Sequence, residues 1–234
     1  MSKVLLAIPA YHGEFYSDGA KTGLFYIEAL HPFKVFRDAG LEVQIVSNDG
    51  KFGIDEHSVI PDFLVGEDGE VYRDENSEFN VALKNIKSAK EIDAKEFSIA
   101  FAAAGHGAMW YPEEKDLRQL FVDIYANGGV AAAVCHGPAI FAKLEDPLTK
   151  KPFFEGKKAT GFTAIGEAQA GADDAMKRFN LSTIEELVEA DNGTYVAPNG
   201  PWDDFTVADG KFVTGVNPQS AASTAKKAIA ALSA

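Results

Sequence analysis

The sequence predicts an α/β protein, a three-layer αβα sandwich built on a mostly parallel β-sheet. Apolar runs of strand length alternate with amphipathic helical patterns along the chain. Two of the runs, residues 97–104 and 130–134, are almost wholly apolar, which is typical of parallel strands buried on both faces. Residues 117–127 between them have apolar side chains at helical spacing, and Gly128 and Gly129 end that helix.

The remaining elements continue the alternation. We expect strands at residues 4–8, 42–47, 158–162 and 195–197, and a hairpin of residues 206–207 with 211–213. We expect helices at residues 22–39, from 138 to about 144, 184–190 and 219–232. Residues 51–95 are richer in Asp, Glu, Gly and Asn, with only short apolar groups. One domain over residues 1–234, with an inserted cap or edge segment at about 51–95, fits this pattern.

Composition limits the classes of partner and compartment. A chain of 234 residues with 46% hydrophobic residues can bury a large core. The net charge of −13 opposes phosphate backbones and anionic lipids, which argues against nucleic-acid and membrane partners. The apolar run at residues 4–8 is too short for a signal peptide or a membrane span. A single cysteine excludes an internal disulfide and fits a reducing compartment, so we expect the cytoplasm, with the nucleus as a second location.

The candidate nucleophile is Cys135, which directly follows the strand at residues 130–134. Pro138 suits the first position of a helix, so strand, tight corner and helix follow one another as in a nucleophile elbow. The positive end of that helix is expected to favour the thiolate, and N–H groups of the corner could bind an oxyanion. The alternative interpretation is a buried, inert thiol.

Two glutamates are further candidates for the site. Glu28 lies within an apolar stretch, and Pro32 lacks the N–H that would bond to its carbonyl group. We interpret Glu28 either as a semi-buried acid with a raised pKa near the site or as an exposed glutamate. Glu167 follows the strand at residues 158–162 and could reach the same sheet edge. A helix N-terminal glutamate explains Glu167 equally well.

The loop after residues 97–104 carries Gly105 and His106. Glycine at this point lets backbone N–H groups approach a ligand, so Gly105 is the second candidate half of an oxyanion hole. His106 is expected to be a loop residue bonded to backbone, with a role in the site as the alternative. His57, beside Asp55 and Glu56, is expected in a solvated loop because no second histidine lies at metal-site spacing. The aromatic loop at residues 11–16 either lines a pocket or anchors into the core.

Three motifs resemble the ThiJ/PfpI superfamily, which has a flavodoxin-like, class I glutamine-amidotransferase-like fold. They are residues 132–138 (AAVCHGP), residues 27–32 (IEALHP) and residues 104–107 (AGHG). Five other stretches are similar to the fungal heat-shock members, which are glutathione-independent glyoxalase III enzymes, also called D-lactate dehydratases. These stretches are residues 15–23, 52–58, 125–129, 200–204 and 214–218.

The resemblance implies roles for five residues. Cys135 matches the family nucleophile, His136 its adjacent histidine, Glu167 the acidic third member and Glu28 the glutamate bonded to the sulfur. The oxyanion donors fall at the N–H groups of Gly105 and His136. Ala104 departs from the glycine of many members, which affects the backbone path of the first donor.

The implied lyase reaction turns methylglyoxal and water into D-lactate through a cysteine hemithioacetal, in detoxification and the stress response. The resemblance implies the related dicarbonyl glyoxal as a further substrate. The reaction requires no metal and no cofactor, because it is an internal redox shift. His136 is the first candidate for the base and Glu28 the second. The family further implies a homodimer and unfolded client proteins.

Three other activities stay open: a holdase-type chaperone, a protein deglycase and a cysteine peptidase or amidase. Adjacent Cys135 and His136 side chains in a tight corner need not point at each other. We therefore expect small aldehydes to be favoured over peptides.

Overall fold

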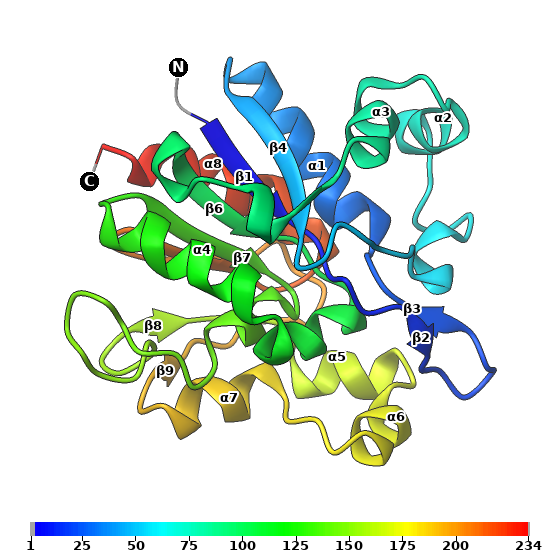
Figure 1. The fold of residues 1–234 in the computed structure, drawn as a ribbon. Helices are drawn as coiled ribbons and strands as arrows, with labels where there is room; N and C mark the ends of the chain where they lie inside the picture. The colour runs from blue at the N-terminus through cyan, green and yellow to red at the C-terminus, as the bar shows by residue number, and fades with distance from the viewer. Residues whose placement is uncertain (1–2, 234) are drawn as a thin grey trace.

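The computed structural model describes residues 3–233, which fold around a seven-stranded β-sheet (Figure 1). The strand order is β10-β11-β7-β6-β1-β4-β5, and every neighbouring pair is parallel except the hairpin of β10 with β11. The strands are β1 (Lys3–Ala7), β4 (Glu42–Ser47), β5 (Lys87–Ser88), β6 (Phe97–Ala102), β7 (Val130–Val134), β10 (Thr206–Asp209) and β11 (Phe212–Gly215). Two-stranded pairs lie outside this sheet: β2 (Gly13–Glu14) with β3 (Lys21–Thr22), and β8 (Lys158–Ala159) with β9 (Thr194–Tyr195).

Helices cover both faces of the sheet, and this confirms the predicted α/β sandwich. Helices α1 and α8 pack together on one face, and α4 packs on the other (Figure 1). The α-helices are α1 (Tyr26–Asp38), α2 (Glu67–Arg73), α3 (Glu78–Lys84), α4 (Lys115–Ala126), α5 (Ala164–Gln169), α6 (Asp173–Arg178), α7 (Ile184–Ala190) and α8 (Ala221–Ala231). The 3₁₀ helices are η1 (Glu56–Val59), η2 (Ala89–Glu91), η3 (Ala94–Glu96), η4 (His106–Glu113), η5 (Gly137–Phe141) and η6 (Pro218–Ser220). None of the helices within residues 3–233 is long and apolar enough to cross a bilayer.

Two of the expected helices differ from those observed. The helix expected from residue 22 begins only at Tyr26, because Lys21 and Thr22 pair with β2 as a strand. The helix expected from residue 138 to about 144 is wrong, since the chain there forms only the five-residue η5. Carbonyl groups at the end of this segment accept hydrogen bonds from a side chain of α4 instead of from later backbone N–H groups. The Arg118 guanidinium donates to the Ile140 carbonyl at 2.9 Å and also to that of Ala142, where the backbone becomes extended.

The central strands place the candidate residues at one edge of the sheet. The ends of β1, β6 and β7 lie side by side, since Ala102 pairs with Ala7 and with Ala133, one residue before the end of β7. Parallel strands end at a common edge, where α/β proteins bind ligands. Gly105 and Cys135 follow β6 and β7 at this edge.

Residues 51–95 contribute at two places. β5 extends the sheet beyond β4, and α2 and α3 lie beside α1 (Figure 1). The chain before them, including η1, reaches the cavity through His57, Ile60 and Phe63.

Candidate active site

Cys135 occupies a left-handed corner at the end of β7, with φ of 60°. Both backbone groups of Cys135 are bonded: its N–H donates to the Gly215 carbonyl, and its carbonyl accepts from the Phe162 N–H, both at 2.9 Å. A side chain at Gly137 would meet the Ala102 carbonyl oxygen at 2.6 Å, so the tight corner requires glycine there. The surrounding chain thus fixes a conformation that non-glycine residues seldom adopt. Cys135 lines a cavity of about 490 Å³.

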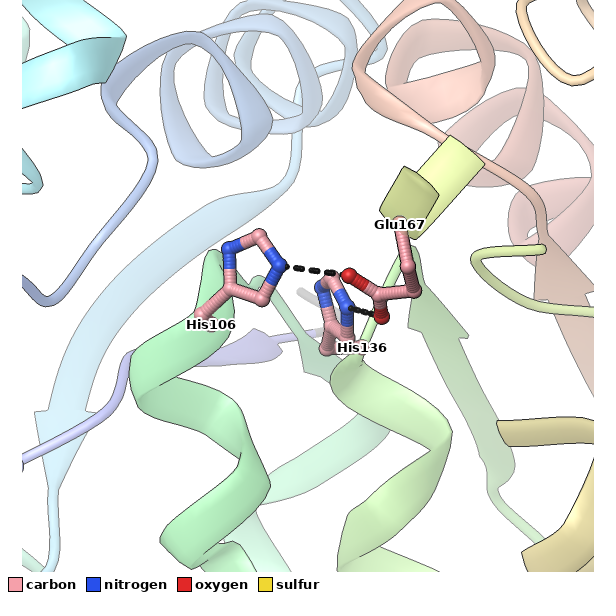
Figure 2. A group of neighbouring side chains, drawn as sticks. All are labelled: His106, His136 and Glu167. Atoms are coloured by element: carbon pink, nitrogen blue, oxygen red, sulfur yellow. Dashed lines mark hydrogen bonds and ion pairs between the residues drawn. The ribbon is translucent and has the colours of Figure 1, made fainter. Parts of the chain in front are cut away.

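The neighbouring His136 does point at the cysteine. Cys135 Sγ lies 3.3 Å from His136 Nδ1, and His136 Nε2 lies 2.7 Å from Glu167 Oε1. Figure 2 shows Glu167 reaching the far side of the His136 ring. Adjacent side chains in such a corner need not meet, but these two do. The arrangement is a Cys–His–Glu chain in which the imidazole can accept the thiol proton.

Glu28 is a fully buried acid beside the sulfur. Its side chain lies in the first turn of α1, where Pro32 leaves the backbone without an N–H for the Glu28 carbonyl. Burial raises the pKa of Glu28 to about 8, although the nearby Cys135 thiol and Ala104 N–H oppose that shift. Neither carboxyl oxygen has a hydrogen-bond partner of good geometry within residues 3–233. Glu28 is therefore mostly protonated at neutral pH and can donate a proton to the cavity.

The thiol of Cys135 is less acidic than the sequence suggested. Burial raises its pKa well above the ordinary value, and the Glu28 and Glu167 carboxyl groups add to the effect. The helix that was expected to favour the thiolate is only the short η5, so its field is weak. Cys135 therefore rests as a thiol that passes its proton to His136 when it reacts.

Glu167 lies in the first turn of α5, capped by Thr163, so both sequence interpretations of this residue describe it. Burial alone would raise its pKa, but the charges and N–H groups of His136 and His106 hold it well below its usual range. Burial lowers the pKa of His136, Glu167 opposes this shift, and His106 reinforces it. At neutral pH the pair is a carboxylate that orients a neutral imidazole.

Gly105 lines the same cavity, at the start of η4, with φ of 114°. A side chain there would meet the Gly23 carbonyl oxygen at 2.4 Å and the Phe25 nitrogen at 2.8 Å. No hydrogen bond within residues 3–233 uses the Gly105 N–H. The His136 N–H lies beside the Cys135 sulfur and lowers its pKa. These two N–H groups are suitably placed to be donors to an oxyanion.

His106 is the residue that the sequence interpretation placed wrongly. It does not bond to backbone: its Nε2 lies 2.8 Å from Glu167 Oε2 (Figure 2). Its Nδ1 lies 3.0 Å from the Tyr16 hydroxyl. Its position directly after Gly105, at the end of a central strand, was the available signal. Of the aromatic loop, Tyr16 lines the cavity and Phe15 is buried against the His106 ring.

His57 was expected in a solvated loop, and its side chain is indeed 35% exposed, but it also belongs to the site. It lines the cavity, stacks on Tyr16 at a centroid distance of 3.9 Å and pairs with Asp18 at 2.9 Å. Asp55 beside it is buried and accepts hydrogen bonds from the Tyr16 and Thr22 hydroxyls. The loop at residues 51–58 is thus part of the site.

His106, His136 and Glu167 offer three ligand atoms within 4.8 Å of one another, the geometry of a possible metal site. The same atoms already bond to each other, Glu167 bridging the two imidazoles. We therefore assign them to a hydrogen-bonded cluster.

A thiol on a nucleophile elbow, an imidazole in contact with it and a carboxylate behind the imidazole define a class of α/β proteins that react through cysteine. The chain belongs to the DJ-1/PfpI family, whose model matches residues 21–231. This confirms the resemblance noted in the sequence.

The similar proteins span nearly the whole chain. It is 56% identical over 232 residues to Glyoxalase 3 of Candida albicans, covering 99% of this chain and 98% of the relative. It is 54% identical over 231 residues to the glutathione-independent glyoxalase HSP31 of Saccharomyces cerevisiae, with 98% of each chain covered. The crystal structure of glyoxalase III from Candida albicans superposes with a TM-score of 0.96, at 56% identity, over 98% of this chain and 97% of that chain.

Proposed function

We propose that this protein is a glutathione-independent glyoxalase that converts methylglyoxal and water to lactate, in detoxification and the stress response. The observation that carries the proposal is the Cys135 sulfur in a small cavity, 3.3 Å from His136 Nδ1. Relatives that are more than 50% identical over nearly the whole chain are named as glyoxalases of this kind.

The first step is addition of the thiol to the aldehyde. His136 takes the thiol proton on Nδ1 while Sγ bonds to the aldehyde carbon. It then passes that proton to the former aldehyde oxygen, which gives a hemithioacetal and a neutral imidazole. The N–H groups of Gly105 and His136 hold the oxygen that becomes negative. Glu167 holds the imidazole in the tautomer that exposes Nδ1 to the sulfur.

The second step moves hydrogen between the two carbons. His136 removes the proton from the former aldehyde carbon while the ketone oxygen gains a proton, which gives an enediol. His136 then returns its proton to the former ketone carbon, and the hydroxyl of the former aldehyde carbon gives its proton to the Glu28 carboxylate as it becomes the thioester carbonyl. Glu28 is protonated at neutral pH because burial raises its pKa to about 8, and it supplies the proton that the ketone oxygen gains as the enediol forms. The former aldehyde carbon is oxidised to a thioester and the ketone carbon is reduced to an alcohol. Water then cleaves the thioester and restores the thiol, so no outside oxidant or reductant enters.

The cavity suits a small neutral carbonyl compound. Its walls carry Phe25, Phe63, Phe162 and Trp202, and Trp202 is fixed by a hydrogen bond from Nε1 to Gln169 Oε1 at 2.6 Å. Ile60 and Trp202 are partly exposed, at 39% and 38%. Apolar walls with a few convergent polar groups at the floor are typical of small-molecule sites.

The test measures lactate from methylglyoxal without glutathione, using the wild-type protein, Cys135→Ser and Cys135→Ala. Both variants should lose at least about 1000-fold in kcat/KM, since neither has a thiol. Thermal unfolding of each variant serves as the control for folding. An enzymatic assay specific for one lactate enantiomer checks the D-lactate expected of a D-lactate dehydratase. Full lactate production by Cys135→Ala would overturn the proposal.

A cysteine peptidase or amidase is the second candidate, because the Cys135–His136 contact is also what such an enzyme needs. Peptide and amide substrates should be assayed on the same preparation. Turnover of these substrates without lactate production would favour it over the glyoxalase. A holdase chaperone predicts that suppression of client aggregation survives Cys135→Ala. The homodimer, deglycase activity and client binding stay predictions.

A further inference from the structure

The contacts behind Glu167 continue to a second buried carboxylate. Glu167 Oε2 lies 2.8 Å from His106 Nε2, His106 Nδ1 lies 3.0 Å from the Tyr16 hydroxyl, and that hydroxyl lies 2.8 Å from Asp55 Oδ2. All four side chains are buried, with at most 6% of any residue exposed. They come from α5, from the start of η4, from the loop between β2 and β3, and from the residue before η1.

The hydrogen-bonded row of Glu167, His106, Tyr16 and Asp55 needs more protons than these side chains carry in their ordinary states. Each of the three contacts needs one proton between its two atoms. The Tyr16 hydroxyl supplies one proton and a neutral His106 ring supplies one. If both carboxyl groups are ionised, one contact is left without a proton. With both carboxyl groups ionised, the four hydrogen-bonded side chains therefore need one proton more than they carry, and the His106 ring has a contact at each nitrogen that can hold it.

We propose that His106 is an imidazolium, protonated on both ring nitrogens, and that it acts as a positioning residue which keeps Glu167 charged and aimed at His136. This inference rests on the glyoxalase proposal and assigns a role to a residue outside the Cys–His–Glu chain. The Tyr16 hydroxyl then donates to Asp55 and accepts from His106 Nδ1, while His106 Nε2 donates to Glu167.

The charge also explains how two carboxylates are tolerated in one buried network. An unpaired buried carboxylate is costly, whereas a cation that bonds to one and is linked to the other offsets that cost. Asp55 receives further donors from the Thr22 hydroxyl and from the N–H groups of His57 and Ser58. Tyr16 stays protonated, because burial and Asp55 raise its pKa well above the ordinary value.

The imidazolium has a consequence for His136. The two rings lie 4.2 Å apart between centroids, so a positive His106 disfavours a second positive ring. Both ring charge and burial keep His136 neutral and able to accept the thiol proton. Charged or titratable groups face the two rings from each element packed against them. They are Glu28 of α1, Tyr16, Asp55, His57 of η1, Cys135 and Glu167 of α5. Arg178 of α6 lies behind the His106 ring, where its guanidinium donates to the Phe15 carbonyl.

Two measurements test the proposal, and the first does not depend on activity. Ring-nitrogen NMR of histidine-labelled protein at pH 7 should show a signal from a histidine with both ring nitrogens protonated that is missing in His106→Gln. A neutral His106 ring would overturn the proposal. Because this readout needs no turnover, failure of the glyoxalase proposal is distinguishable from failure of this one.

The second measurement is the pH dependence of kcat/KM for methylglyoxal. Without the positive ring, Glu167 stabilises a protonated His136, so the acidic limb in His106→Gln should move to higher pH by about 1 unit. Tyr16→Phe removes the acceptor of the Nδ1 proton and should move the limb in the same direction by less. Thr22→Val removes a different donor to the same Asp55 oxygen and is the matched control, with an unmoved limb. A lower kcat in His106→Gln with an unmoved limb would mean a merely structural role and would overturn the proposal.

Discussion

At the scale of single residues, the site depends on groups whose protonation is set by burial. Glu28 and Cys135 are both buried beside the cavity, and burial raises the pKa of each. Glu167 differs because two imidazoles surround it and hold its pKa low. Two kinds of carboxyl group thus lie within one small site: an acid that retains its proton and an anion that orients a base.

The buried Glu28 should make stability depend on pH. Its pKa is raised from 4.5 to about 8, so the folded protein keeps a proton that the unfolded chain loses as pH rises through this interval. The contribution of Glu28 to the free energy of unfolding is fully present below about pH 4.5 and is lost as pH rises to about 8. Glu28→Gln has no such titration. The free energy of unfolding of the variant, relative to that of the wild type, should therefore rise by on the order of 3 kcal/mol from pH 5 to pH 8.

Urea unfolding of both proteins at the two pH values measures this gain. Glu70→Gln, at an exposed position, is the control and should show no such gain. An equal difference between Glu28→Gln and wild type at both pH values would contradict a buried, protonated Glu28.

At the scale of elements, the sequence predicted what periodicity and burial determine. The strands β4 and β7 and the helix α7 were predicted with their observed bounds, because their residues are uniformly strand-like or helix-like. The end of β7 at Cys135 was predictable from the Gly-Pro that follows. The shortness of η5 was not, because it depends on Arg118 of α4, which is distant in the sequence.

Side-chain partners were the less predictable part of the site. Glu28, Cys135, Gly105 and His136 all line the cavity, as their positions after strands or within α1 suggested. Tertiary contacts decide the rest: His106 bonds to Glu167 and Tyr16, which are far away in the sequence. No local pattern specifies such partners.

The start of η4 gives a prediction at this scale. Gly105→Ala should destabilise the protein by about 3 kcal/mol or more, since φ is positive and the new side chain would strike backbone atoms of residues 23 and 25. Gly128 also has positive φ, at 82°, but open space around it. Gly128→Ala should therefore cost only about 1 kcal/mol.

Thermal unfolding of the two variants separates backbone strain from collision. Gly105→Ala should also lose activity at temperatures where it is still folded, because the N–H group proposed as an oxyanion donor is displaced. Equal losses of stability in the two variants would contradict the packing argument.

At the scale of the whole molecule, charge and cavity act in the same direction. The chain carries a net charge of −13, and the residues that line the cavity include Asp18 and Glu28 but neither Lys nor Arg. A negative surface and a cavity lined by neither Lys nor Arg repel anions, since the proposed cation, His106, is already bonded to the Glu167 carboxylate. The site therefore suits uncharged carbonyl compounds.

Two aldehydes of equal carbon number test this selectivity. 2-Oxopentanal is neutral and 4,5-dioxopentanoate is an anion, and both carry the ketone beside the aldehyde that the reaction needs, so kcat/KM should be at least about tenfold higher for 2-oxopentanal. Raising the salt concentration should narrow the difference in part, because screening weakens the long-range repulsion. Comparable rates for the two compounds at low salt would contradict this selectivity.

The left-handed backbone at residue 135 also restricts how descendants of this protein can diverge. Valine, isoleucine and threonine are poorly tolerated in that conformation whatever their reactivity, whereas glycine and asparagine adopt it more readily. Loss of the thiol during evolution is therefore screened first by conformation and only then by chemistry. A protein with glycine or asparagine at position 135 would keep the fold and the cavity but lack the thiol. Such a protein is a starting point for a receptor or sensor that binds small molecules without transforming them.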